Sequence, residues 1–352
     1  MTAQAGFARA SRLAWTGRVV LAALLLIAAV ASGAAIGETS IPLAVIAKTL
    51  ANKILAAGYP LDAIDEGIIW NYRLTRTIVA ACCGAALAVS GVVLQSLLRN
   101  ALADPYILGI SAGASTGAVT VAIAGLGAGL VSLSLGAFAG AVLAFLLVAL
   151  LARAAGGGVS MQATGQIILA GIAGSQLFNA LTSFIITKSA NAEQARGIMF
   201  WLLGNLSGVR WSDVWLAVPV AILGVLVCLW HRRALDAFTF GSDSAASLGI
   251  PVRRVQIILI GTSALMTAVM VSMVGSIGFV GLVIPHATRF LVGVRHAGLL
   301  PVSALMGSIF LVSADIASRI AIPGQVLPIG VVTALVGAPG FAIILVRGRR
   351  IR

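Results

Sequence analysis

The segment HRRALDAFTFGSDSAASLGIPVRR, residues 231–254, is a polar stretch with basic residues at both ends, and it separates two blocks of apolar segments. We refer to it as the connector. Within it, GSDSAASLGIP is typical of one short helix, because Ser242 is a suitable N-cap, Gly249 suits the position just past the last turn, and Pro251 prevents continuation. Such a segment is either a plain linker or a docking site for a partner protein.

The composition on both sides of the connector is that of a membrane protein. Apolar residues make up 60% of the chain, charged residues make up 9%, and the mean hydropathy is +1.09. Soluble domains carry about 25% charged residues, so a water-soluble fold is excluded. The 40 glycines fit the same class, because small residues allow membrane helices to approach closely. We therefore predict an all-α polytopic membrane protein.

Windows of about 20 apolar residues predict ten transmembrane helices. We expect the first to be retained as a span, not cleaved as a signal peptide. A further stretch, residues 41–57, is interrupted by Lys48, Asn52 and Lys53, and we expect an amphipathic helix on the membrane surface there. Ten spans divide into two halves of five, and the second copy of a five-span repeat must insert upside down. The predicted spans are 15–36, 74–98, 107–125, 130–152, 166–187, 214–230, 255–274, 277–294, 298–318 and 326–346.

The distribution of charge supports ten spans and predicts their orientation. With this count, 15 of the 23 Lys and Arg residues but only three of the 10 acidic residues fall on the side that holds the N-terminus. An excess of positive charge marks the cytoplasmic side of a membrane protein. Both termini and the connector are therefore expected in the cytoplasm, and the net charge of +13 requires no nucleic-acid partner.

The chain carries no recognisable catalytic motif. Its three histidines form no HExxH pattern, and none of its three lysines follows a glycine-rich phosphate loop. We expect no enzyme activity, metal or cofactor in this chain, so any ATP and Mg²⁺ must bind a separate subunit. An ion-coupled secondary carrier is an alternative, although such carriers place ionisable residues at the membrane midplane, which is not evident here. A membrane receptor or scaffold is a further alternative.

Two arginines stand out at the outer end of the second predicted span. Arg73 and Arg76 are three residues apart and hence share one helical face. They either extend to the lipid headgroups or pair with carboxylates of a partner outside the membrane. Both interpretations predict side chains that are exposed at the outer face.

Several long motifs occur in the same order as in one family and resemble its motifs. The family is that of the permeases of type II ABC importers, which carry iron–siderophore complexes, haem and vitamin B12. The resemblance covers essentially the whole chain. Three positions depart from the family pattern: Thr75 and Ala101 replace prolines, and Val326 replaces a glutamate. The matching motifs are RLTR at 73–76, ALAVSGVVLQSLLRNALADPYILGISAGA at 86–114, GFVGLVIPHATR at 278–289, AD at 314–315 with Arg319, and LPIGVVTALVGAP at 327–339.

The resemblance implies one permease domain over residues 1–352, with inverted repeats of about 1–190 and 191–352, in the bacterial inner membrane. Its implied partners are a second permease copy, identical or paralogous, two cytoplasmic ATPase subunits and a periplasmic binding protein. Substrate would pass between the two permeases, along the fifth and tenth spans. A ferric siderophore or haem is the expected substrate, with vitamin B12 as the alternative.

The family's functional residues are carried onto three sets of positions here. Arg73, Arg76 and Arg319 would form salt bridges with the binding protein. The cytoplasmic gate would comprise Ala163, Thr164 and Gly165, just before the fifth span. The coupling helix that contacts the ATPase would comprise Gly241, Ser242, Asp243, Ser244, Ala245, Ala246, Ser247, Leu248 and Gly249.

Overall fold

A computed structural model describes residues 2–124, 132–156, 161–189 and 191–348. Every named element in these residues is helical, and each of the ten predicted spans contains a helix. The all-α prediction is therefore confirmed. The helices are α1 (Thr2–Ala35), α4 (Thr75–Leu97), α5 (Ile110–Ala124), α6 (Leu133–Ala154), α7 (Met161–Ser189), α9 (Trp211–Trp230), α12 (Val252–Val274), α13 (Val280–Val292), α14 (His296–Ile320) and α15 (Ile329–Gly348).

Shorter elements join these helices. They are α2 (Leu43–Leu55), α3 (Ala63–Gly67), a π-helical segment η1 (Ile68–Leu74), a 3₁₀ helix η2 (Pro105–Leu108), α8 (Ala192–Leu202), α10 (Arg232–Phe238) and α11 (Ser242–Ser247). Helix α2 lies within the stretch 41–57 where a helix was expected, and its Ile46 is buried with Ile41 and Ile69. Its exposed residues are mixed, Lys48 and Lys53 with Leu43, Ile54 and Leu55, and its position on the membrane surface stays a prediction. The sequence did not predict α8 or α10.

Length and composition separate the apolar helices into two groups. Among the described residues, six helices are long and apolar enough to cross a membrane: Ala63–Leu97, Leu133–Ala154, Gly165–Lys188, Trp211–Trp230, Val252–Val274 and His296–Ile320. Four shorter apolar helices cover Val20–Ala35, Ile110–Ile123, Val280–Val292 and Ile329–Ile343. Both groups coincide with predicted spans, while the exact number of spans and the division into repeats stay predictions.

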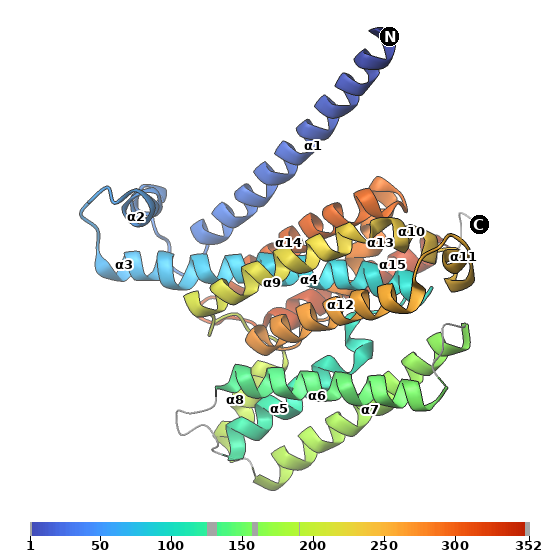
Figure 1. Ribbon diagram of the computed structural model, residues 1–352. Coiled ribbons are helices and arrows are strands. Elements are labelled where there is room, and N and C mark those ends of the chain that lie inside the picture. Colours follow the sequence, from blue (N-terminus) through green and yellow to red (C-terminus); the bar gives the residue numbers. More distant parts are fainter. Residues whose placement is uncertain (1, 125–131, 157–160, 190, 349–352) are drawn as a thin grey trace.

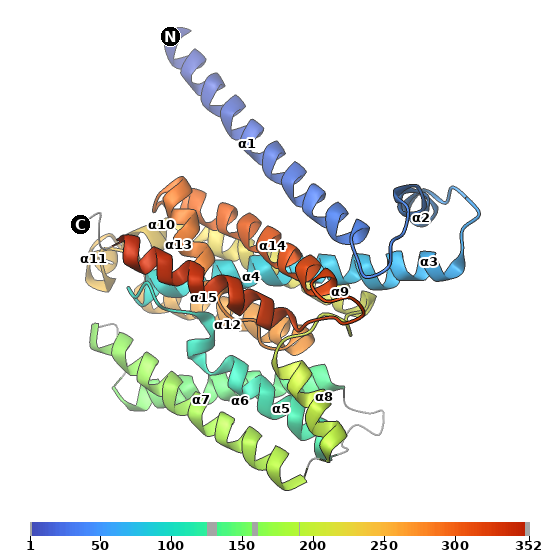
Figure 2. The ribbon, with the colours of Figure 1, turned by 180° about the vertical axis from the view of Figure 1, so that it is seen from behind.

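Helix α4 forms the centre of the fold. It is buried along nearly its whole length, and it packs against α9, α12, α13 and α14, all from the second half of the chain. Figures 1 and 2 show it running between these helices, with α2 and α3 at one end of the bundle and α10, α11 and the C-terminus at the other. Glycines allow this packing: Gly84 lies against the backbone of Gly307 in α14, and Gly91 against that of Gly281 in α13.

Helices α5, α6 and α7 form a second group, which lies with α8 on the far side of α12 (Figures 1 and 2). Gly113 and Gly117 of α5 meet the backbone of Gly140 and Gly136 in α6, as the glycine content predicted. The C-terminal end of helix α1 packs against α14, and the N-terminal part of α1 projects away from the bundle.

The two short helices α5 and α13 both begin after a break in the helical backbone. Gly109 precedes α5 with φ +77°, and Phe279 precedes α13 with φ +69°, so each break contains a left-handed residue. Tyr106 joins the two breaks, because its hydroxyl donates to the carbonyl of Ile277 and accepts from the Ile277 N–H, both at 3.0 Å. The freed polar groups of an interrupted membrane helix are thereby satisfied from within the protein.

Candidate functional site

An arginine cluster lies at the α3 end of the bundle, where α4 begins and α14 ends. Asp315 of α14 is its centre: Arg76 Nε lies 2.5 Å from Asp315 Oδ1, and Arg319 Nη2 lies 2.9 Å from Asp315 Oδ2. The remaining donors of Arg76 reach three hydroxyls. These are Tyr72 Oη at 2.8 Å, Ser207 Oγ at 3.0 Å and Ser318 Oγ at 3.2 Å. We define the cluster as Arg73, Arg76, Asp315 and Arg319.

The cluster also holds the C-terminal end of α1. Arg319 donates to the carbonyls of Gly33 at 2.9 Å and Ile36 at 2.8 Å. Arg73 donates to the carbonyl of Ala35 at 3.0 Å and to that of Thr39. The last carbonyls of a helix have no partner within it and carry partial negative charge, so guanidinium groups are suitable partners for them.

The prediction that these arginines are exposed is wrong. Arg73, Arg76 and Arg319 were expected at an exposed face, but their relative exposures are 2%, 1% and 1%. Burial was unpredictable because the compensating carboxylate of Asp315 lies 239 residues beyond Arg76. The cluster still borders a pocket of about 170 Å³, lined in part by Glu38, Thr39, Arg73 and Arg319. The docking role of the three arginines stays a prediction.

The connector lies at the opposite end of the bundle and contains two short helices, α10 and α11. Its predicted stop is confirmed: Gly249 has φ +79° and donates to the carbonyl of Ala246 at 2.9 Å, and Ile250 N–H donates to the carbonyl of Ala245 at 3.1 Å. This pair of bonds is a Schellman motif. The predicted N-cap is wrong, since Gly241, with φ +108°, occupies that position and Ser242 is the first helical residue.

The connector has one small side chain buried in the bundle and two large apolar side chains exposed. Ala245 is fully buried against the bundle, whereas Phe240 and Leu248 have relative exposures of 76% and 71%. Phe240 lies in the turn before α11 and Leu248 directly follows that helix, so the two exposed apolar side chains flank α11 and could contact a partner protein.

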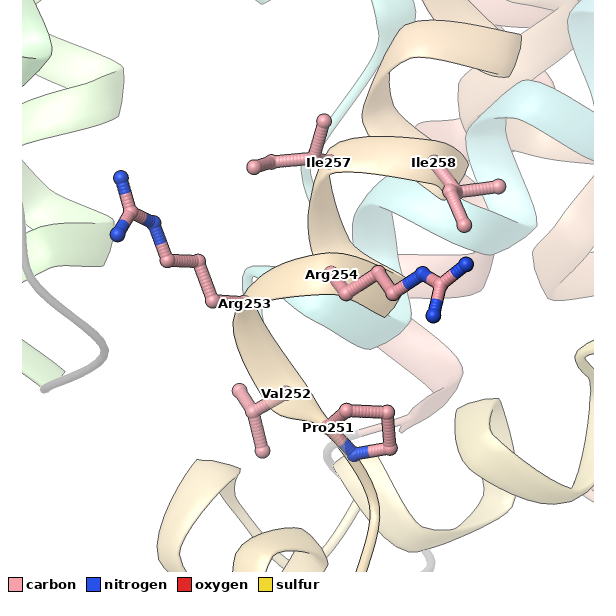
Figure 3. Close-up of a pocket in the computed structure, with 6 residues that line it drawn as sticks. All are labelled: Pro251, Val252, Arg253, Arg254, Ile257 and Ile258. Carbon is pink, nitrogen blue, oxygen red and sulfur yellow. The ribbon is translucent and has the colours of Figure 1, made fainter.

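A basic hollow lies at the C-terminal end of the connector, where α12 begins. It has a volume of about 730 Å³ and is lined by Pro251, Val252, Arg253, Arg254, Ile257 and Ile258. In Figure 3 the side chains of Arg253 and Arg254 extend to opposite sides of α12. The two guanidinium groups give the connector end a positively charged surface next to its exposed apolar one.

Three residues far apart in the sequence tie the connector to the bundle. Asp236 of α10 lies 2.7 Å from His296 Nδ1 of α14, and His296 Nε2 lies 2.7 Å from Ser96 Oγ of α4. Sequence reasoning missed this group because positions 96, 236 and 296 share no motif or spacing. The order Ser–His–Asp resembles a hydrolytic triad, but Ser96 is buried and bonded to the Val92 carbonyl at 2.8 Å, so its hydroxyl is not available to a substrate.

The predicted gate residues belong to a helix and not to the loop before it. Ala163, Thr164 and Gly165 lie in the first turns of α7, which begins at Met161. Gly165 is exposed, and an added Cβ would meet nothing within 4 Å. The side chains of Ala163 and Thr164 lie outside what the structure describes. The gate role stays a prediction.

His286, the histidine of the broken span, has its own partners within the protein. Its Nδ1 lies 2.8 Å from the carbonyl of Leu282, and its ring meets Phe341 edge-on at a centroid distance of 5.9 Å. Among the described residues, no group of three or more His, Cys, Asp or Glu side chains could hold a metal ion.

A bundle of apolar helices with a charged cluster at one end and an exposed connector at the other fits a membrane permease. The chain belongs to the FecCD transport family, whose sequence profile matches residues 24–347. The cobalamin import system permease protein of Halobacterium salinarum is 37% identical over 98% of this chain and 99% of its own length. An uncharacterized ABC transporter permease protein of Bacillus subtilis is 41% identical over 82% of this chain and 81% of its own length.

A solved structure confirms the fold assignment. The solved structure titled "An inward-facing conformation of a putative metal-chelate type ABC transporter" superposes with a TM-score of 0.79 at 29% identity, covering 94% of this chain and 99% of the matched chain. The fold is thus that of the type II ABC importer permeases. Its relatives are transport subunits, in agreement with the expectation that this chain is not an enzyme.

Proposed function

We propose that the chain is the permease subunit of an ATP-driven importer for a corrinoid of the vitamin B12 type. The observation that carries this proposal is the similarity to the Halobacterium cobalamin permease over nearly the full length of both chains. The vitamin B12 import system permease protein of Salmonella paratyphi A, 38% identical over 84% of this chain and 89% of its own length, supports the same substrate class. The ferric siderophore or haem expected from the family resemblance becomes the second candidate.

A ferric siderophore or haem is the second candidate substrate. The solved metal-chelate type transporter favours it, because that structure is similar over 94% of this chain. All three substrate types are large complexes in which an organic ligand binds a metal ion. The metal ion here is cargo, and no residue of this chain is assigned to it.

The proposed assembly places a partner at each end of the bundle. Two ATPase subunits, which bind ATP and Mg²⁺, would contact the connectors of two permease copies, identical or paralogous, on the cytoplasmic side. A periplasmic binding protein would deliver substrate at the arginine cluster end. The exposed Phe240 and Leu248 and the basic hollow at Arg253 and Arg254 support the ATPase contact. A transporter with these partners on its two sides would lie in the bacterial inner membrane.

Uptake by the reconstituted transporter tests the function. The chain with its ATPase and binding protein is placed in proteoliposomes, and uptake of radiolabelled cyanocobalamin is compared with that of ferric siderophores and haemin. We expect vanadate-sensitive uptake of cyanocobalamin that does not depend on an ion gradient. Uptake that requires the gradient and resists vanadate would identify a secondary carrier, and binding without uptake would identify a receptor.

Replacing Leu248 by Asp should weaken the contact with the ATPase and leave the fold intact. Leu248 is 71% exposed, so a charge at this position costs no buried contact within the chain. Burying the new carboxylate against an apolar partner surface is unfavourable, and we expect co-purification of the ATPase to fall by about tenfold or more. Leu102→Asp, at an exposed position in the turn between α4 and η2, outside the predicted spans and the connector, is the matched control. Equal ATPase recovery in wild type and Leu248→Asp would show the connector to be a plain linker.

Filling the pocket beside the arginine cluster should weaken association of the binding protein. Thr39 lines this pocket together with Arg73 and Arg319, whereas its exposed neighbour Ser40 does not. We expect Thr39→Trp to reduce affinity by about tenfold, and Ser40→Trp to change it little. The wild-type affinity should fall as salt is raised, because a partner carboxylate reaches the arginines through this pocket. A Thr39→Trp variant with wild-type affinity by surface plasmon resonance would remove the docking role.

A further inference from the structure

Helix α14 reaches both the connector and the arginine cluster, and α4 runs beside it from Arg76 in the cluster to contacts with α10. The first residue of α14, His296, contacts Asp236 of the connector, and Asp315 and Arg319 in its last turns form part of the arginine cluster. The helix is continuous over its 25 residues, and Pro301 lies within its first two turns without interrupting it. A displacement of its first turn is therefore carried along the helix to the cluster.

The connector supplies the cap of this helix. Helix α14 has no side-chain cap of its own, because the residue at the N-cap position is Arg295. Instead Asp236 Oδ1, from α10, accepts the backbone N–H of His296 at 2.9 Å and faces His296 Nδ1 at 2.7 Å. The first N–H groups of a helix have no intrahelical acceptor and carry partial positive charge, so a carboxylate is their favoured partner. A cap from another element holds the two elements in one relative position.

The bridge extends from His296 into the central helix. His296 Nε2 lies 2.7 Å from Ser96 Oγ of α4, and the imidazole is buried, with 1% of its surface exposed. A neutral imidazole accepts the Ser96 hydroxyl at Nε2, and a protonated one donates to the same oxygen while the hydroxyl donates to the Val92 carbonyl. The bridge therefore persists in both protonation states, and it joins α10, α14 and α4.

Apolar packing holds α10 in place independently of the bridge. Leu235 and Phe238 of α10 are fully buried in the same hydrophobic cluster as Leu299 and Leu300 of α14. Apolar contact is non-directional, whereas the two hydrogen bonds between Asp236 and His296 define one register between α10 and α14. Loss of the bridge should therefore leave the connector attached but free to move without moving α14.

We propose that Asp236 and His296 are positioning residues which transmit movement of the connector to α14, and so couple the ATPase contact at one end of the chain to the arginine cluster at the other. The inference rests on the proposed function, because it takes the connector as the contact with an ATPase. Neither residue touches substrate or nucleotide in this arrangement. Their effect is on the coupling between two binding events.

The experiment uses the complete transporter, with both permeases, both ATPases and the binding protein, in nanodiscs, and cyanocobalamin as substrate. Asp236→Ala and His296→Ala are compared with wild type by three measurements: co-purification of the ATPase, basal ATP hydrolysis, and the stimulation of hydrolysis by loaded binding protein. We expect recovery and basal hydrolysis within about twofold of wild type and a loss of stimulation of about tenfold or more. The double variant should be no worse than either single one, because both remove the same bridge.

Two further variants separate coupling from general structure. Asp236→Asn retains an oxygen that accepts the His296 N–H, and it should recover part of the stimulation lost in Asp236→Ala. Asp213→Ala is the matched control, since Asp213 caps its own helix by accepting the Arg210 N–H at 2.8 Å and bridges no other element. It should keep full stimulation.

The outcomes are distinguishable. If Asp236→Ala and His296→Ala retain full stimulation, or if they lose the ATPase on purification, the coupling proposal is overturned, since the bridge is then dispensable or serves only to build the contact. If the wild-type complex itself shows no ATPase binding and no stimulated hydrolysis, the proposed function fails before the bridge is tested.

Discussion

Asp315→Asn should lower the free energy of unfolding by about 3–5 kcal/mol, the cost of leaving a buried charge without its partner. Asp315 is completely buried and is paired with Arg76 and Arg319, and Arg73 lies close by. An asparagine of the same shape leaves these guanidinium groups to repel each other away from water. Unfolding in nanodiscs, followed by tryptophan fluorescence or by the yield of monodisperse protein on heating, measures the effect.

The control for Asp315→Asn is an ion pair that is exposed. Lys53 and Glu66 lie 2.5 Å apart, with side-chain exposures of 39% and 25%. Lys53→Met should cost less than about 1 kcal/mol, because a solvated pair gains little from its attraction. If Asp315→Asn costs no more than Lys53→Met, the buried cluster does not stabilise the chain as the geometry indicates.

Gly91→Ala should destabilise the bundle by about 1–3 kcal/mol, and Gly84→Ala should do the same. A methyl group added at Gly91 would overlap the backbone carbonyl of Gly281, and one at Gly84 would overlap that of Gly307. A backbone carbonyl cannot rotate away as a side chain can, so α4 must separate from α13 or α14. The polar groups along these contacts would then lose their geometry too, including the 3.2 Å bond from Gln95 Nε2 to the Gly281 carbonyl.

A helical glycine in open space provides the comparison for these two variants. Gly261 lies within α12, and a Cβ added there would meet nothing within 4 Å. Gly261→Ala should be neutral or stabilising, since alanine loses less conformational freedom than glycine on folding. The temperatures of half-unfolding of Gly84→Ala, Gly91→Ala and Gly261→Ala measure these effects. Equal values for the three variants would contradict close packing of α4.

The features predicted correctly from the sequence are those that depend on local patterns of residues. Apolar windows located a helix in each of the ten segments, and the Gly249 stop followed from the need for a left-handed residue past the last turn. The second predicted span begins at residue 74, beside the start of α4 at Thr75, but the helical run itself begins earlier, at Ala63. Asp62, as N-cap, with Asp65 and Glu66 in the first turn, was the signal that could have found this start.

Contacts between residues far apart in the chain could not be predicted from local sequence patterns. Exposed arginines are the reasonable expectation at a span end, and only the position of Asp315 on α14 shows that they are buried. In the same way, nothing in the local sequence relates Ser96, Asp236 and His296, which are brought together by the packing of α4, α10 and α14. These interactions depend on tertiary structure, which a local pattern does not encode.

The continuous helical run from Ala63 to Leu97 has a consequence for the shape of the outer surface. Its 35 residues extend about 50 Å at the rise of a helix, and the hydrocarbon layer is about 30 Å thick. Several turns must therefore stand clear of the lipid, and the carboxylates of Asp62, Asp65 and Glu66 lie on that protruding part. This part of the run contacts α2 and forms a raised rim on the predicted outer side, and an approaching macromolecule would meet this rim before it meets the headgroups.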